Sequence, residues 1–245
     1  LEMATELNRY FASVHQNVTD DGTLPPTVRL APERHFEFVS FDRDKIKKAI
    51  DSLKGDTAPG PDGIGARTLK CLKEELSNPI AIILNKTMAG DPIPSRWKQS
   101  NVTAIFKKGK KCEVSNYRPI SMENLLCKLG EKVLKNELLD YLTQNSLISC
   151  TQHGFMPGRS TTTNLIEYLD YITDALDRGQ TVCSIYTDFS KCFDRIPHHL
   201  IIHKLKNRYG IEGMVLNWIR DWLSNRKQRV VLNGEASDWV EVVSG

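Results

Sequence analysis

A carboxylate at the end of a strand-forming segment is the clearest candidate for chemistry in this sequence. Residues 182–187 are rich in β-branched and aromatic side chains and predict a strand largely buried in a sheet, with Asp188 at its carboxyl end. Burying an unpaired carboxylate is costly unless a cation meets it. Asp188 is therefore either a metal ligand at the mouth of a sheet or a strand-end residue that caps the next turn.

Basic side chains gather in a loop that follows a second predicted strand, over residues 101–106. Between positions 96 and 112 there is no acidic residue, and the cations are Arg96, Lys98, Lys107, Lys108, Lys110 and Lys111. Such a run can contact phosphates or steer a polyanion, although many basic runs are only solvated loops. Arg118 lies after this loop and directly before Pro119. A rigid turn at this proline would present the Arg118 guanidinium either to a phosphate or to a surface salt bridge.

Composition narrows the class of protein. With 245 residues, of which 40% are hydrophobic, the chain can form one large domain or two small ones. Its longest apolar runs are far below the roughly 20 residues of a membrane span, so no membrane association is expected. Six cysteines without a Cys-x-x-Cys pair argue against a zinc ribbon and favour reduced thiols in an intracellular protein. Because residue 1 is not Met, we expect the chain to start inside a longer reading frame.

Hydrophobic periodicity predicts the elements that position these residues. Helices are expected near 1–18, 42–53, 122–142, 161–178 and 197–209, the fourth with Leu165, Leu169, Ile172 and Leu176 along one side. A proline-punctuated connector follows the first helix, and residues 1–38 are interpreted as an appendage or linker. Near the carboxyl end, Asn233-Gly234 predicts the turn of a hairpin. The mixture of helices and strands without repeats predicts an α/β (α+β) fold.

Histidines give little support to a zinc site. His199 and His203 lie one helical turn apart and His198 is adjacent, but no further ligand is evident nearby. A structural role at the start of a helix is preferred.

Several motifs in order resemble the reverse transcriptases of non-LTR, LINE-like retrotransposons, most closely their jockey and CR1 groups. The motifs are Ala58–Ile64 (APGPDGI), Trp97-Lys98, Ile105–Gly109 (IFKKG), Asn116–Ser121 (NYRPIS), Gln152–Ser160 (QHGFMPGRS) and Thr187–Asp194 (TDFSKCFD). The resemblance covers residues 40–245 and implies the fingers and an incomplete palm of a right-hand polymerase. It divides the chain into residues 1–38, a helix and linker; 39–165, the fingers; and 166–245, a partial palm.

The resemblance also implies roles for individual residues. Asp188 matches the first metal-binding and catalytic aspartate, which would hold Mg²⁺. Lys107, Lys108 and Arg118 would contact the incoming dNTP together with Phe189 and Phe193, and Phe193 matches the aromatic gate that excludes a ribose 2′-hydroxyl. Lys110, Lys111 and Arg159 would contact nucleic acid. An RNA template, a DNA primer and dNTP are therefore the expected partners.

One departure limits the expected activity. In the family, the segment after Gly245 leads to a hairpin with paired catalytic aspartates, which this sequence lacks, so the polypeptide is interpreted as a fragment that does not polymerise alone. One carboxylate does not hold two magnesium ions in reactive geometry. The missing hairpin also predicts an unpaired sheet edge beside residues 182–188. The alternatives are a non-catalytic nucleic-acid-binding remnant of a mobile element and a decayed remnant without function.

Overall fold

A computed structural model describes residues 1–16, 24, 26, 28, 30 and 35–245, so most of the predicted proline-punctuated connector lies outside the described residues. The helices are α1 (Glu2–Gln16), α2 (Arg43–Asp51), α3 (Ala66–Cys71), α4 (Lys73–Met88), α5 (Leu125–Gln144), α6 (Thr161–Asp177), α7 (His198–Tyr209) and α8 (Gly213–Leu223). Short 3-10 turns are η1 (Ser95–Lys98), η2 (Val114–Asn116) and η3 (Phe193–Arg195). The strands are β1 (Gln99–Phe106), β2 (Tyr117–Glu123), β3 (Arg226–Leu232), β4 (Glu235–Ala236) and β5 (Val240–Val242). The mixed helix and sheet composition confirms the predicted α/β class.

The sheet joins strands that are far apart in the sequence. Its order is β2-β1-β3-β4, and β5 also pairs with β3. β1 and β2 are antiparallel neighbours, whereas β1 and β3 are parallel and are joined through α5, α6, α7 and α8. The hairpin β3-β4 turns at Asn233-Gly234, where both residues have positive φ (52° and 84°), as a two-residue type I′ turn requires. The predicted hairpin turn is confirmed.

The segment around Arg118 and Pro119 is a strand, and its interpretation as a rigid turn is wrong. Arg118 pairs with Ile105, and Pro119 pairs with Ala104, in the antiparallel ladder of β1 and β2. A proline cannot donate a ladder hydrogen bond, and β2 accommodates Pro119 because it is an edge strand. Proline favours turns, and the sequence does not show that this segment becomes an edge strand, where proline is tolerated.

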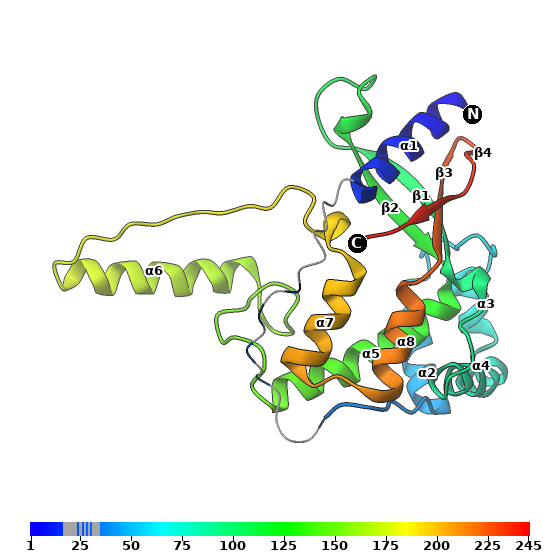
Figure 1. The fold of residues 1–245 in the computed structure, drawn as a ribbon, viewed down its shortest axis with the longest axis horizontal. Coiled ribbons are helices and arrows are strands. Elements are labelled where there is room, and N and C mark those ends of the chain that lie inside the picture. Colours follow the sequence, from blue (N-terminus) through cyan, green and yellow to red (C-terminus); the bar gives the residue numbers. More distant parts are fainter. Residues whose placement is uncertain (17–23, 25, 27, 29, 31–34) are drawn as a thin grey trace.

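Helices α2, α4, α5 and α8 enclose the main hydrophobic core. Ile46 and Ile50 on α2 have no exposed surface, and the Asp42 side chain caps this helix by accepting a bond from the Lys45 amide at 2.7 Å. Gly130 allows α5 and α4 to approach closely, because a Cβ there would lie 2.7 Å from Leu84 Cδ2. The helices that enclose this core lie at one end of the sheet (Figure 1).

Helix α1 belongs to the body of the protein and is not an appendage. Its Ala4, Leu7 and Phe11 side chains are buried against Val102 of β1 and Val230 of β3. Figure 1 shows α1 lying over the sheet beside the β1-β2 hairpin. Its amphipathic pattern predicted the helix, but not the surface that the helix covers.

The predicted buried strand at 182–187 is wrong, because this segment is irregular and exposed. Figure 1 shows α6 projecting from the body, with the following segment running back along it. Ile185 and Tyr186 are 84% and 82% exposed. A strand is stable only when a neighbouring strand pairs with its backbone, and within the described part of the chain none pairs with this segment. The start of α6 was predicted correctly, since Ser160 caps it, but Leu165, Leu169 and Leu176 on its apolar side are exposed.

Candidate nucleic-acid interface

The lysine loop, residues 107–116, is an ordered connection between β1 and β2. The Lys107 amide donates to the Asn116 carbonyl at 2.8 Å, and Asn116 Nδ2 donates to the Lys110 carbonyl at 3.0 Å. The Tyr117 hydroxyl donates to the Lys111 carbonyl at 2.8 Å. Gly109, at φ +88°, takes a backbone conformation that few other residues tolerate. The loop backbone is therefore held in one conformation while its lysine side chains are exposed.

Four lysines of the predicted basic run are exposed on this loop: Lys107, Lys108, Lys110 and Lys111. Their ammonium groups therefore remain hydrated and available to phosphates. Lys111 also lies over the Phe106 ring, 5.9 Å from its centroid. The geometry agrees with a positively charged tip that can contact a polyanion.

Lys98, from the same basic run, has a different role. Its ammonium donates to Asp221 Oδ1 at 2.7 Å and its side chain is 7% exposed, so it cannot also bind a phosphate. Asp221 Oδ2 accepts from the Ile93 amide at 2.8 Å. Burial acts to raise the pKa of Asp221, but the bonds from Lys98 and Ile93 outweigh it and lower the pKa. This ion pair attaches α8 to the segment that enters β1.

Arg118 is exposed on the sheet face opposite α1. Across the ladder it pairs with Ile105, and Ile105 and Ile120 are each 45% exposed on this face. Arg229 of β3 belongs to the same face, because it pairs with Asn101 of β1, and its Nε donates to Asn101 Oδ1 at 2.8 Å. Sequence reasoning missed Arg229, since only the β1-β3 pairing places it on the same face as Arg118. Arg118 lies beside the end of β1, next to the lysine loop, whereas Arg229 lies nearer the start of β1, where its guanidinium also stacks on Trp239.

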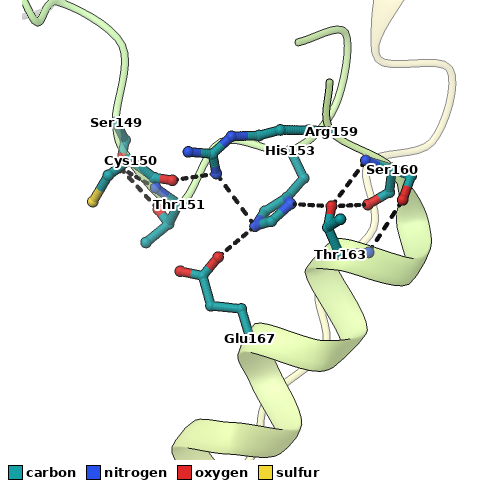
Figure 2. A network of polar contacts seen from close by, with 8 residues as sticks. All are labelled: Ser149, Cys150, Thr151, His153, Arg159, Ser160, Thr163 and Glu167. Atoms are coloured by element: carbon teal, nitrogen blue, oxygen red, sulfur yellow. Dashed lines mark hydrogen bonds and ion pairs between the residues drawn. The ribbon is translucent and has the colours of Figure 1, made fainter. Parts of the chain in front are cut away.

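Arg159 is held in a polar network at the start of α6 (Figure 2). One of its guanidinium nitrogens donates to the Cys150 carbonyl and lies 3.5 Å from His153 Nε2. His153 bonds to Glu167 Oε2 at 2.6 Å and to Thr163 Oγ1 at 3.1 Å, so two residues of α6 fix its ring. The network anchors the 150–160 turn to α6 and orients Arg159, whose contact with nucleic acid stays a prediction.

Asp188 is exposed and does not lie at the end of a buried strand. In the described part of the chain, no hydrogen bond or ion pair reaches its carboxylate, and none joins it to the lysine loop. Because an exposed carboxylate keeps its hydration, it does not require a cationic partner. Phe189 is 76% exposed, and Phe193 is 71% exposed, with its ring centre 5.9 Å from that of Phe155 in an edge-to-face arrangement. The roles of these residues therefore stay predictions.

Helix α1 links the region after Asp188 to the β1-β2 hairpin. The Lys191 ammonium donates to the Tyr10 hydroxyl at 2.7 Å and lies 4.3 Å from the centre of its ring. His15 Nδ1 and Ser244 Oγ both bond to the Asp194 carbonyl, at 2.9 and 2.7 Å. Tyr10 also packs on the core under the lysine loop. Sequence reasoning missed this link because nothing in the pattern of α1 identifies its distant partners.

His198 and His203 make hydrogen bonds within the protein. His198 Nε2 donates to the Gly245 carbonyl at 3.0 Å, and burial lowers the pKa of His198. His203 Nδ1 bonds to Asn207 at 2.9 Å. The structural role preferred for His198 agrees with these contacts.

Comparison with known proteins identifies the family of this fold and basic surface. Residues 105–243 match the family model described as reverse transcriptase (RNA-dependent DNA polymerase). The match covers more than half of the chain, and the chain belongs to this family.

Curated relatives include proteins of mobile elements from Drosophila melanogaster. The "Probable RNA-directed DNA polymerase from transposon BS" is 32% identical over 73% of this chain and 20% of that protein. The RNA-directed DNA polymerase from mobile element jockey is 25% identical over 82% of this chain and 22% of its own length. The predicted resemblance to reverse transcriptases of non-LTR retrotransposons is confirmed. The chain spans about a fifth of the length of these relatives.

Among residues 1–16 and 35–245, no helix is both long enough and apolar enough to cross a membrane.

Proposed function

We propose that this chain takes part in RNA-directed DNA synthesis as the fingers and part of the palm of a retrotransposon reverse transcriptase. The observation that carries the proposal is the ordered loop with four exposed lysines, within the segment that matches the family. Its partners would be an RNA template, a DNA primer and dNTP. In the proposed division, residues 39–165 form the fingers and residues 166–245 belong to the palm.

Electrostatics support nucleic-acid binding more strongly than the small net charge of +3 suggests. Affinity for nucleic acid depends mainly on cations that displace counterions from phosphates, and clustered charges do this better than scattered ones. Lysines elsewhere, such as Lys47 and Lys73, are paired with Glu74 and Asp51. The lysine loop is therefore the main basic contact, with Lys107, Lys108 and Arg118 toward the triphosphate and Lys110, Lys111 and Arg159 toward the nucleic-acid backbone.

Asp188 is the proposed ligand for a divalent cation, and Mg²⁺ suits its oxygen donors. Phe189 and Phe193, close by in the sequence, would face the nucleotide. The described residues place no group of three ligands at Asp188, so it would hold such an ion only with oxygens from the nucleotide or from additional protein groups. The ion would neutralise phosphate charge. This chain supplies one exposed carboxylate, which can bind an ion without first breaking a bond to another protein group.

The cell interior is the proposed location. All six cysteines are free thiols, which fits a reducing compartment.

The test is salt-dependent binding of an RNA–DNA primer–template hybrid, measured by fluorescence anisotropy. A variant with Lys107, Lys108, Lys110 and Lys111 changed to Ala is compared with a control in which the exposed Lys54, Lys86, Lys135 and Lys204 are changed. Both lose four charges, but only the loop variant should reduce the slope of log affinity against log salt, by about 2 to 4. Equal weakening in the two variants would show non-specific attraction and refute the proposed interface.

A further inference from the structure

Three metal-ligating side chains meet on the side of the molecule formed by the segment before α2 and the corner between α7 and α8. They are His35, Glu37 and Glu212, and one ligand atom from each lies within 4.8 Å of the other two. His35 Nδ1 is 3.2 Å from Glu212 Oε2. None of the three belongs to the proposed nucleic-acid interface.

Backbone hydrogen bonds hold the two segments in register. Phe36 and Ile211 form a parallel bridge, in which the Phe36 amide donates to the Gly210 carbonyl and the Glu212 amide donates to the Phe36 carbonyl, each at 3.0 Å. The Val215 amide donates to the Glu37 carbonyl at 3.0 Å. In an extended segment, positions i and i+2 share a side, so His35 and Glu37 lie together while Phe36 stacks on Tyr141, 5.1 Å between ring centres. The backbone therefore places the ligands before any ion binds.

The spacing suits a four-coordinate ion. Zinc bonds of about 2.0 to 2.2 Å in tetrahedral geometry put neighbouring ligand atoms roughly 3.3 to 3.5 Å apart. The His35–Glu212 pair is already near this separation, and Glu37 is exposed, so its side chain can move to complete the set. The group borders a cavity of about 930 Å³, which leaves room for a water molecule as the fourth ligand.

Charge and donor type indicate which ion fits. The group contains two carboxylates and one imidazole. Even with His35 protonated, the group keeps a net negative charge. A divalent cation bound together with a neutral imidazole would balance the charge of the two carboxylates. Imidazole nitrogen suits Zn²⁺, while Mg²⁺ prefers oxygen ligands. We propose that His35, Glu37 and Glu212 bind one Zn²⁺, which clamps the segment before α2 to the α7–α8 corner. This site is independent of the proposed polymerase function.

The test is isothermal titration calorimetry with ZnCl₂, combined with thermal unfolding. Exposed thiols also bind zinc, so the background is the full chain with Cys71, Cys112, Cys150, Cys183 and Cys192 changed to Ser. We expect one Zn²⁺ per chain and a higher unfolding temperature with Zn²⁺ than with Mg²⁺. Glu37→Gln and His35→Ala should each weaken binding by more than about tenfold, since loss of a direct ligand exceeds the usual effect of losing its supporting partners.

Asp140→Asn is the matched control, because this exposed carboxylate lines the same cavity outside the ligand group. It should leave the affinity for Zn²⁺ unchanged. Absence of stoichiometric binding, or equal weakening by Asp140→Asn and Glu37→Gln, would overturn the proposal. If His35→Ala unfolds the chain, Glu37→Gln still tests the proposal. Glu37→Gln should not disturb the fold, because the side chain is exposed and the Val215 amide donates to the backbone carbonyl of Glu37.

Discussion

Glu131 on α5 should make the stability of this protein fall as the pH rises. Its carboxyl group is partly buried, and the Cys127 thiol donates to Glu131 Oε1 at 3.7 Å. Burial, followed by the charge of Glu123, raises the pKa of Glu131 from 4.5 to about 7. Arg226 offsets this only in part, because it is bound to Glu123 at 2.7 Å. Arg226 thus interacts with both Glu123 and Glu131, and the pKa of Glu131 stays raised.

The direction and size of the effect follow from linkage. Below about pH 4.5 both folded and unfolded chains carry the proton, whereas between pH 4.5 and about 7 only the folded chain does. The free energy of unfolding therefore falls across this interval and levels off above it. At ~1.4 kcal/mol per pKa unit, the loss is about 3 kcal/mol at most.

Glu131→Gln keeps the shape of the side chain and removes the ionisable group. It should match the wild type near pH 4.5 and be more stable by about 2 to 3 kcal/mol at pH 8. The measurement is urea unfolding at half-unit steps of pH, with the exposed Glu235→Gln as control. Parallel wild-type and Glu131→Gln curves, or a less stable variant at pH 8, would refute the reasoning.

Four further predictions concern the contacts described above. Asp221→Asn leaves Lys98 buried without its counter-charge and should cost about 3 kcal/mol in urea unfolding at pH 7, so a loss under ~1 kcal/mol would count against the pair. Gly109→Ala strains the backbone at φ +88° and puts a Cβ 2.5 Å from Asn116 Nδ2, so it should lower the melting temperature and weaken hybrid binding, whereas Gly55→Ala, which has open space, should do neither; equal effects of the two changes would count against the ordered loop. Tyr10→Leu should speed hydrogen exchange of the 191–195 amides but not of α5, and unchanged exchange would exclude the link through α1. Asp188→Asn should change stability by less than ~0.5 kcal/mol while removing the Mg²⁺-dependent part of dNTP binding; equal Mg²⁺ dependence in both proteins would contradict its role.

Local signals predicted much of the fold. Asp42 and Ser160 cap α2 and α6, and Gly210, at φ +65°, ends α7 close to the predicted helix bounds. Asn233-Gly234 turns the hairpin. Each of these features depends on a few neighbouring residues, so the sequence alone is sufficient to identify it.

Features that depend on distant partners could not be predicted in the same way. Residues 182–187 have strand-forming side chains, but strand formation also requires a paired neighbour. The sequence places Lys98 in a basic run, but in the structure its side chain is paired with Asp221, 123 positions away, and is shielded from solvent. The lysine loop was identified correctly as exposed, whereas the partners of Arg159 and α1 come from the tertiary structure.

Photo-cross-linking maps the proposed interface most directly. A primer–template hybrid with 4-thiouridine along its RNA strand is irradiated with the chain, and cross-linked peptides are identified by mass spectrometry. The account predicts cross-links concentrated in residues 105–118 and 153–160, competed by unlabelled hybrid. Cross-links concentrated on α2 or α4, with none in the lysine loop, would contradict it.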